Sequence, residues 1–454
     1  MNLPNYFLAD LPPEAVVSAA MVAEACQTLK RNRERYLMNR LTESLIKTLS
    51  GVADGWLEEN NSFRKLALEL GPAQTGFSRE TLARGLDNFF NQLTRDNFHA
   101  LLVQEFGDAK RLDSLAATTL EQKQNRMAIV NAPEFQVHIC AGNIPNPTLT
   151  SIVFGLLTRS AQFVKCAIGA AFLPRLFAHS IYEADGKLGA CLEIAEWRGG
   201  NLDLENTLFA EADCVTATGD DETLAAICAR LPIKTRFLGH GHRVSFGFVA
   251  HEVLYGSRAK KIAAAAADDV VAWNQLGCLS PHVIYVESGG EISAEHFAQL
   301  LAEELEKREV SEPRGELSAE HAAAIASRRG IYEVRAAHSP ETTQHWCSKD
   351  STAWTVVFEA DARFQLSCLN RFIYVKGVAD LKTALENADS VRGEVSTVGI
   401  AAPEEKANEI ATQLARWGAT RICPLGQMQN PPLTWRHDGR PALGDLITWT
   451  DLEL

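Results

Sequence analysis

Short apolar runs alternate with amphipathic stretches of helical spacing from about residue 135 onward. The runs are rich in Val, Ile and Phe, as is typical of buried strands, and turn-forming residues separate them from the helices. In the first block this pattern predicts strands at 137–142, 162–167, 214–219 and 243–250, with helices at 148–157, 173–184 and 220–231. Regular alternation of strand and helix predicts a doubly wound parallel sheet, which binds ligands at the carboxyl ends of its strands.

A second α/β block follows the first. Its pattern predicts helices at 252–268, 293–308, 317–328 and 403–417, a strand at 283–287, and further segments at 330–337, 352–360, 370–376, 396–401 and 419–425. Before both blocks the chain is mainly helical, and Ser78 is expected to cap a helix that runs toward Leu93. The final stretch 429–454, rich in Pro and Trp, is expected to form an extended tail that docks on another surface.

Length and charge narrow the possible functions. A chain of 454 residues is too long for a single core and predicts two or three domains. The formal net charge of -13, without a long block of Lys or Arg, disfavours a nucleic-acid partner. Apolar runs stay far below the ~20 residues that span a bilayer, and the N-terminal sequence lacks the features of a secretory signal, so we expect a cytoplasmic protein.

The cysteines include one candidate nucleophile. None of the ten belongs to a C-x-x-C motif or to a Cys/His cluster with metal-ligand spacing, so we expect reduced thiols and no metal. Cys278 lies beside Gly277 in a polar turn that runs straight into the apolar strand 283–287. A thiol there is accessible to a substrate. The alternative is a small buried apolar side chain, and the local sequence leaves both interpretations open.

Three further positions follow strands of the first block. Asn143 could donate a hydrogen bond to an oxyanion, although Asn and Pro at this point also suit a simple turn. Lys165 could bind a nucleotide cofactor or simply extend to solvent. Gly219 precedes a helix, but the chain contains neither G-x-G-x-x-G nor a Walker A motif, and Asp220 suits a helix cap better than a pyrophosphate.

Taken together, these segments resemble the aldehyde dehydrogenase superfamily. The resemblance rests on A-G-N-I-P around Asn143, F-V-K-C-A at 163–167, Thr-Gly at 218–219 and N-Q-L-G-C-L-S-P-H-V-I-Y-V-E at 274–287, in this order. More narrowly, they resemble the LuxC-type acyl-CoA reductases, whose best-known members supply aldehyde for bacterial luminescence. The closing segment 418–426, with Asp438-Gly439 and Trp449, also resembles that branch.

The resemblance implies a role for each matching residue. Cys278 matches the catalytic nucleophile, and Asn143 matches the side-chain donor to the oxyanion. Lys165 matches the lysine that contacts the adenosine ribose of the cofactor. Gly219 falls where the superfamily cradles the cofactor beside the start of a helix.

Three departures from the superfamily pattern refine this picture. Asp220 replaces a common serine, which puts phosphate contact at that turn in doubt. Ile168 replaces a Glu that grips the ribose in many NAD-dependent members, so NADP(H) is favoured over NAD(H). Upstream of the cysteine, 237–243 reads F-L-G-H-G-H-R where hydrolytic members carry a water-activating Glu. His240 and His242 there could serve as a base, contact the nucleotide, or simply be solvated.

The fold that the resemblance implies is aldehyde-dehydrogenase-like α/β. Its expected parts are a helical N-terminal portion (1–130) packed on the cofactor domain, a Rossmann-like NADP-binding domain (131–268), a catalytic domain (269–428) and the tail (429–454), a possible oligomer contact. The implied function is NADPH-dependent reduction of an acyl thioester, either acyl-CoA or acyl-protein, to the aldehyde through an acyl-cysteine.

Three alternative functions remain open. They are a CoA-acylating aldehyde dehydrogenase run in the oxidative direction, a hydrolytic aldehyde dehydrogenase, and a non-catalytic scaffold for acyl transfer. An acyl-transferring protein partner and a homo-oligomer are also expected, by analogy at the level of the fold.

Overall fold

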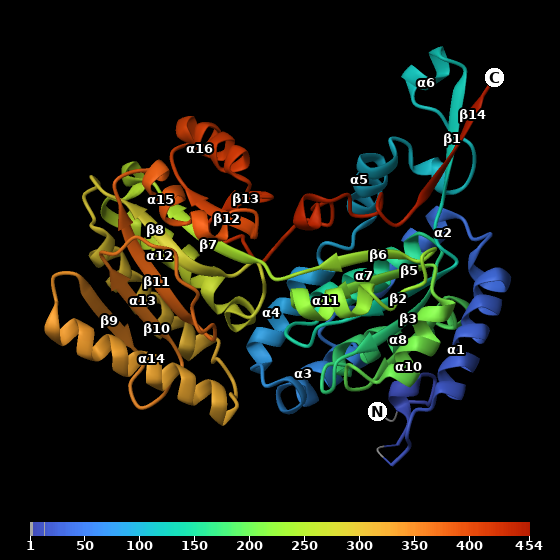
Figure 1. Ribbon diagram of the computed structural model, residues 1–454, viewed down its shortest axis with the longest axis horizontal. Coiled ribbons are helices and arrows are strands. Elements are labelled where there is room, and N and C mark those ends of the chain that lie inside the picture. The colour runs from blue at the N-terminus through green and yellow to red at the C-terminus, as the bar shows by residue number, and fades with distance from the viewer. Residues whose placement is uncertain (1–2, 13) are drawn as a thin grey trace.

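The first α/β block forms a five-stranded parallel sheet in the computed structural model, which describes residues 3–12 and 14–454 (Figure 1). In pairing order its strands are β4 (Leu192–Glu196), β3 (Ala161–Cys166), β2 (Phe135–Ile139), β5 (Cys214–Thr218) and β6 (Arg236–His240). The first strand in sequence, β2, lies in the middle of the sheet. Strands β3 and β4 extend the sheet to one edge, and β5 and β6 then extend it to the other. The order therefore reverses between β2 and β5, which is where sheets of this kind bind their ligands.

Helices cover both faces of this sheet. One face packs against α1 (Ala19–Asn32), α10 (Leu202–Glu211) and α11 (Asp221–Cys228), and the other against α7 (Asn146–Leu157) and α8 (Phe172–Ala184). Adjacent residues of β3 point to opposite layers: Phe163 packs in the first core and Val164 in the second. The strand period of two therefore explains why the apolar run of β3 is continuous.

The N-terminal portion is helical, as predicted. Its main helices are α2 (Thr42–Leu57), α3 (Ser62–Thr75), α4 (Arg79–Phe90) and α5 (Arg95–Phe106), followed by the short α6 (Thr119–Lys123). The larger helices share one hydrophobic core with α7 and α8. Ser78 caps α4 by accepting a hydrogen bond from the Thr81 N–H at 3.1 Å, which confirms the expected cap.

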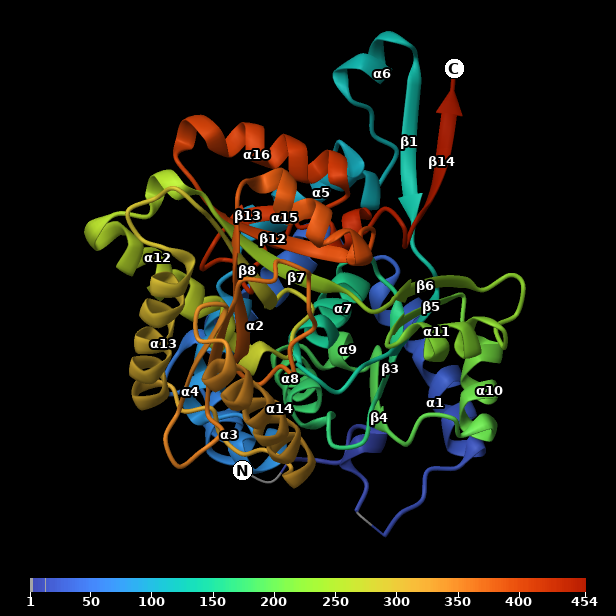
Figure 2. The same ribbon diagram turned by 60° about the vertical axis from the view of Figure 1, so that its left-hand side comes forward.

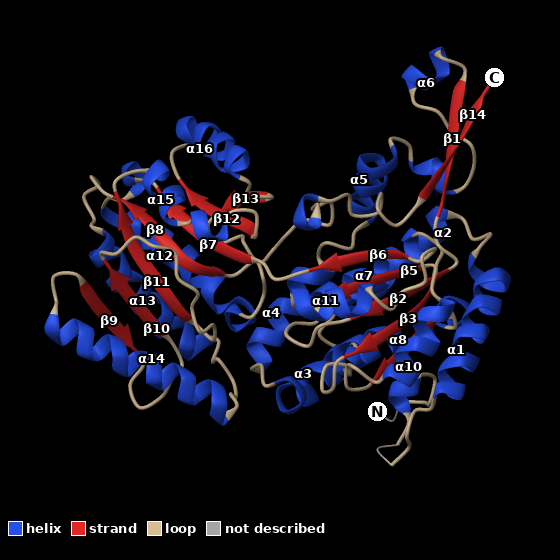
Figure 3. Ribbon diagram, viewed as in Figure 1, coloured by secondary structure: helices blue, strands red, loops and turns tan. Residues whose placement is uncertain are grey.

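The second α/β block forms a seven-stranded sheet (Figure 3). In pairing order its strands are β13 (Arg421–Pro424), β12 (Val395–Ala401), β7 (Val244–Val249), β8 (Pro281–Glu287), β11 (Phe372–Val378), β10 (Thr355–Glu359) and β9 (Thr343–Cys347). The edge strand β9 is antiparallel to β10, and the other pairs are parallel. Across the residues described, none of the helices combines the length and the apolar character needed to cross a membrane.

Helices also cover both faces of the second sheet. One face packs against α12 (Gly256–Val271) and α13 (Ala294–Ser311). The other packs against α14 (Ala319–His338), α15 (Leu381–Asn387) and α16 (Glu404–Trp417). The segment 330–337 belongs to the long helix α14, not to a separate element.

Two sequence predictions need correction. The segment 237–243, for which the pattern predicts no strand before residue 243, contains most of strand β6, so His240 ends a strand. The strand predicted at 243–250 exists as β7, but it pairs with β8 and β12. The chain therefore changes sheets between β6 and β7 and not at residue 268. A buried parallel strand has the same apolar pattern in either sheet, so local sequence does not say which sheet it joins.

The tail returns from the second sheet to the first and ends in a ribbon. There β14 (Thr448–Glu453) pairs antiparallel with β1 (Arg126–Asn131). Figure 2 shows this ribbon extending away from both sheets, and most of β14 is exposed. An oligomer contact through the tail stays a prediction.

At Gly85, helix α4 packs closely against Trp273 in the second half of the chain. A Cβ at Gly85 would overlap the indole ring of Trp273. Trp273 is 3% exposed and packs edge to face on Phe77, with ring centroids 5.1 Å apart. The small residue therefore allows a close helix contact just before the Cys278 loop.

We expect Gly85→Ala to lower the free energy of unfolding by ~1–3 kcal/mol, because it overpacks a filled contact. Gly51→Ala is the matched control, since it also lies in a helix but has no atom within 4 Å of the added Cβ. There the better helix propensity of Ala should raise stability by up to ~1 kcal/mol. Urea unfolding followed by circular dichroism measures both, and equal shifts of the same sign would contradict the predicted contact.

Candidate active site

Cys278 lies in the loop between the short helix η5 (Ala272–Gln275) and β8. Just before it, Trp273, Asn274 and Gln275 have left-handed backbone, with φ of 50°, 52° and 64°. A second left-handed run, at 369–371, precedes β11 with φ of 59°, 54° and 66°. Each such residue costs ~1–2 kcal/mol when it is not glycine, so both runs need tertiary support.

Buried hydrogen bonds join the two left-handed runs. Arg371 Nε donates to Asn274 Oδ1 at 3.0 Å. Gln275 Nε2 donates to the carbonyls of Pro281 at 2.7 Å and Phe372 at 3.0 Å. Arg371 and Gln275 are fully buried, so losing either partner would leave a buried polar group unpaired. These bonds fix the start of the Cys278 loop.

The loop is held from both sides at Cys278. Ser245 Oγ of β7 donates to the Cys278 carbonyl at 2.7 Å. On the other side, Gln429 of the tail donates from Nε2 to Ser280 Oγ. A Cβ at Gly277 would lie 2.7 Å from Gln429 Nε2, so glycine is needed for the tail to approach the loop this closely.

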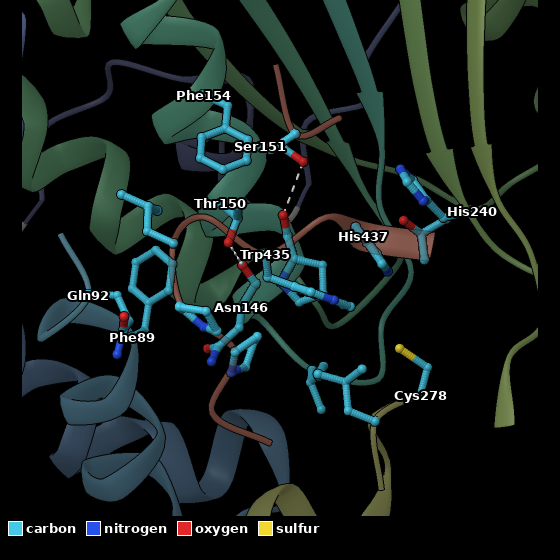
Figure 4. Close-up of a pocket in the computed structure, with 18 of the residues that line it drawn as sticks. Phe89, Gln92, Asn146, Thr150, Ser151, Phe154, His240, Cys278, Trp435 and His437 are labelled. Atoms are coloured by element: carbon cyan, nitrogen blue, oxygen red, sulfur yellow. Dashed lines mark hydrogen bonds between the residues drawn. The ribbon is translucent and has the colours of Figure 1, made fainter. Parts of the chain in front are cut away.

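The thiol of Cys278 faces a cavity of about 210 Å³ (Figure 4). Its walls come from α4, α7, the strands β2, β5 and β6, and the tail. Most of the wall is apolar, including Phe89, Leu93, Ile144, Phe154, Leu279 and Leu433. Asp445 is the one carboxylate among the described residues that line it. Asn146 Oδ1 and Trp435 Nε1 are buried without a hydrogen-bond partner among those residues.

The apolar surroundings change the acidity of the thiol. Burial, together with the charge of Asp438, raises the pKa of Cys278 to about 12, although Arg243 acts in the opposite direction. The thiol is therefore protonated at neutral pH. Because the thiolate is the nucleophile, an attack by Cys278 needs a proton acceptor nearby.

A cluster around Asp438 borders the same cavity, whose wall includes His240 and His437. His240 Nδ1 is 2.9 Å from Asp438 Oδ2, and Arg243 Nε donates to Asp438 Oδ1 at 3.2 Å. The ring of His437 stacks on that of His240, with centroids 4.3 Å apart and planes at 7°. Burial raises the pKa of Asp438, but the hydrogen bond with His240 and the charges of His437, His240 and Arg243 outweigh it and leave the pKa well below its usual range. The buried carboxyl is therefore ionised.

The same cluster has the spacing of a metal site. Ligand atoms of His240, His437 and Asp438 all lie within 4.8 Å of one another. The two imidazole planes are nearly parallel, however, so their lone pairs run side by side instead of converging on one ion. Arg243 also neutralises the carboxylate. The arrangement suits proton transfer better than metal binding.

The predicted cofactor residues lie at strand ends of the first sheet. Lys165 is 4% exposed, and its ammonium makes no hydrogen bond with the described residues. A Cβ at Gly199 would lie 3.8 Å from Lys165 Nζ. Burial lowers the pKa of Lys165, and Glu205 opposes that shift. Gly219 follows β5, where its N–H donates to the His240 carbonyl at 3.2 Å.

The structure brings some of the predicted site residues together and separates others. Cys278 and His240 line the same cavity. Asn143 is exposed and lines a smaller cavity, which shares Ile144 with the larger one. His242 is exposed, two residues before the buried strand β7 begins at Val244.

Sequence reasoning missed His437 and gave Asp438 no chemical role. Asp438 and Gly439 both have left-handed backbone, with φ of 54° and 74°, and an Asp-Gly pair in a loop is a signal for such a turn. That signal marks the turn but not its partner. His240 lies 198 residues away in sequence, so no local pattern connects the two side chains.

A comparison with known protein families identifies the family to which the chain belongs. Residues 37–449 match the family described as acyl-CoA reductase (LuxC). The chain belongs to this family. The finding confirms the resemblance drawn from the cysteine segment and the closing segment.

Individual LuxC relatives are distant in sequence. The chain is 24% identical over 320 residues to long-chain acyl-protein thioester reductase 2 of Photobacterium leiognathi, and 25% identical over 328 residues to the long-chain acyl-protein thioester reductase of Aliivibrio fischeri. Each alignment covers 70% of this chain and 63% of the relative. With the reductase of Photorhabdus luminescens the identity is 22% over 424 residues, which cover 90% of this chain and 82% of the relative.

Solved structures confirm the predicted fold class. The aldehyde dehydrogenase KauB from Pseudomonas aeruginosa superposes with a TM-score of 0.72 at 15% identity, over 98% of this chain and 91% of KauB. The putative aldehyde dehydrogenase PutA from Anabaena variabilis gives a TM-score of 0.69 at 15% identity, over 96% of this chain and 93% of that protein. This LuxC-family chain therefore has the aldehyde dehydrogenase fold.

We expect Ser245→Ala to lower the free energy of unfolding by ~1–3 kcal/mol, because it leaves two buried groups unpaired. They are the Cys278 carbonyl and the Thr397 N–H, which donates to Ser245 Oγ at 3.1 Å. Ser114→Ala, in an exposed turn, is the control and should change stability by no more than ~0.5 kcal/mol. If both variants unfold at the wild-type urea concentration, the contact does not support the Cys278 loop.

Proposed function

We propose that the protein reduces an acyl thioester to the aldehyde through an acyl-cysteine on Cys278. One observation carries this proposal. The thiol faces a cavity with apolar walls, and the cavity adjoins the carboxyl ends of the strands in a doubly wound parallel sheet, where such sheets bind cofactors. The names of the relatives, long-chain acyl-protein thioester reductases, agree with it. The donor in this proposal is acyl-CoA or an acyl group on a protein thiol.

The cavity suits an acyl chain because its wall is made largely of aliphatic, aromatic and proline side chains. Burying each methylene group contributes ~0.8 kcal/mol. Affinity should therefore increase with chain length until the cavity is filled. The tail supplies much of this wall, including Pro431, Pro432, Leu433 and Leu446.

The chain's own residues account for the acyl transfer. Cys278 attacks the carbonyl carbon of the thioester, and the departing thiol leaves the acyl group on Cys278. In the proposed site the Cys278 N–H stabilises the oxyanion, a donor being worth ~3 kcal/mol in such a transition state. The amide of Asn143 would add a second donor by turning from the adjoining smaller cavity toward the thioester. When bound, NADPH supplies the hydride that converts the acyl group to the aldehyde.

Hydrolysis is disfavoured because no Glu stands where the hydrolytic members activate water. In this chain 237–243 supplies Phe237, which packs in the core formed with α1 and α10. The acyl-cysteine is therefore kept for reduction or for transfer to another thiol. The CoA-acylating direction uses the same groups in reverse, so only rates can distinguish it.

The strand ends of the first sheet fit a phosphorylated nucleotide. Lys165 places an unpaired ammonium beside the Gly199 turn, and the neighbouring Arg198 is exposed. Glu196, the nearby carboxylate at the end of β4, accepts a hydrogen bond from the Ala171 N–H at 3.1 Å. Ile168 is 66% exposed in the loop after β3, where a carboxylate would repel a 2'-phosphate. We therefore propose NADPH as the cofactor.

Other expectations remain predictions at this stage. They are an acyl-transferring protein partner, a homo-oligomer that the tail helps to form, and a cytoplasmic location.

We expect Cys278→Ala to abolish both aldehyde formation and acyl labelling, because it removes the nucleophile. The purified protein is incubated with acyl-CoAs of graded length, NADPH consumption is followed, and the acylated residue is located by mass spectrometry. Cys228→Ala, at an exposed position in α11, is the control and should retain both. Labelling that persists on another cysteine would contradict the proposal, and free acid as the product would indicate a hydrolytic enzyme.

We expect Ile168→Glu to raise the Kd and the KM for NADPH at least about tenfold, equivalent to ~1.4 kcal/mol, with little loss for NADH. The introduced carboxylate would repel the 2'-phosphate and could hold a ribose hydroxyl. Ile233→Glu is the matched control, because Ile233 is fully exposed just before β6 at the opposite end of the strands. Fluorescence titration and steady-state rates measure the effect, and equal changes for both nucleotides would contradict NADPH selection.

A further inference from the structure

Asp438 raises a question that the acyl chemistry alone does not answer. Its buried negative charge works against the ionisation of Cys278. A site that needs a thiolate gains nothing from such a carboxylate unless it acts through another group. The group it contacts is His240, at 2.9 Å.

The hydrogen bond fixes the state of the His240 ring. Because Asp438 is ionised and can only accept, His240 Nδ1 must carry the proton in that bond. In the neutral ring His240 Nε2 is then an acceptor, and it makes no hydrogen bond with the described residues. Figure 4 shows His240 and His437 on the wall of the cavity that Cys278 also lines.

The backbone at Asp438 supports a positioning function. The residue has left-handed φ of 54°, and its side chain is 2% exposed although it lies in a loop of the tail. Arg243 Nε holds the second carboxylate oxygen at 3.2 Å, so the carboxylate cannot rotate away from His240. The stack of His437 fixes the plane of the His240 ring from one side.

We propose that His240 accepts the proton of the Cys278 thiol, directly or through one water molecule, and that Asp438 is the positioning residue that orients His240. The inference rests on the proposed function for its chemistry. It assigns the tail a part in the reaction in addition to its part in the cavity wall.

The proton balance of the step is complete. The S–H bond of Cys278 breaks and its proton goes to His240 Nε2, while the sulfur forms a bond to the acyl carbon. The bond from that carbon to the departing thiol then breaks, and His240 returns the proton to the departing sulfur. Asp438 stabilises the imidazolium in between without becoming protonated. No oxidant or reductant is required in this half of the reaction.

Other titratable and charged groups also lie around His240. They are His437 and Arg440 from the tail, Arg243 from its own segment, and Asp221 from α11 next to Gly241. Asp438 is the one that bonds the ring directly, so the pH dependence should follow the His240–Asp438 pair.

The test uses the full chain and two readouts of the thiol step without NADPH. One is the release of CoA when acyl-CoA acylates Cys278, and the other is alkylation of Cys278 by iodoacetamide, quantified by mass spectrometry between pH 6 and 10. At pH 7 we expect His240→Asn to slow both about 100-fold, within the ~10²–10⁴ range of general bases, and Asp438→Asn to slow both about tenfold.

The pH profile separates a proton acceptor from a structural residue. In the wild type the rates should depend only weakly on pH above pH 7, because the proton acceptor belongs to the site. In His240→Asn they should rise about tenfold per pH unit, because hydroxide replaces the base, and approach the wild type near pH 9. A loss of constant size at every pH would overturn the inference.

Two variants distinguish a specific effect on proton transfer from a general loss of the folded structure. Asn tolerates left-handed backbone, so Asp438→Asn removes the charge and keeps the turn. His99→Asn makes the same change on the exposed face of α5 and should match the wild type in both readouts. If alkylation depends on His240 but no aldehyde forms with NADPH, the proposed function fails and the proton-transfer pair stands. If aldehyde forms but the His240→Asn loss is independent of pH, the reverse holds.

Discussion

Desolvation of Cys278 is the constraint on which the rest of the site depends. The apolar cavity would supply binding free energy to the acyl chain that we propose as substrate, but the same surroundings raise the pKa of the thiol to about 12. In the proposed reaction, exposing the thiol would not solve this problem, because water near an acyl-cysteine would compete with hydride. A buried nucleophile with an apolar wall therefore needs a local proton acceptor.

The tail reconciles these demands because it contributes to each of them. It supplies apolar wall at Leu433 and Leu446, and Gln429 closes over the nucleophile loop. It also brings Asp438 to His240. After these contacts it runs on to pair with β1, so the end of the chain is tied to the start of the first sheet. Three parts of the chain that are far apart in sequence thus meet around one sulfur atom.

Local pattern predicted most of the elements, because a strand or helix depends on the period of its own apolar residues. The cap at Ser78, the strand β2 and the helix α7 on either side of Asn143, and the helix α16 follow from residues within a few positions of each other. Nothing local assigns β7 to the second sheet, since its apolar run would suit either one. For the same reason Cys278 could be found from its turn and from resemblance, whereas its surroundings could not.

The left-handed runs before β8 and β11 connect stability with function. Six residues in strained backbone are held by a small number of buried polar contacts, of which the bond from Arg371 to Asn274 is central. Strain of this kind persists only where the surrounding structure fixes it, and it concentrates at functional sites. A relaxed loop would let the thiol rotate toward solvent, away from the apolar wall. In the reaction that we propose, the strain would therefore keep Cys278 where it depends on His240 for ionisation and on hydride for release of its acyl group.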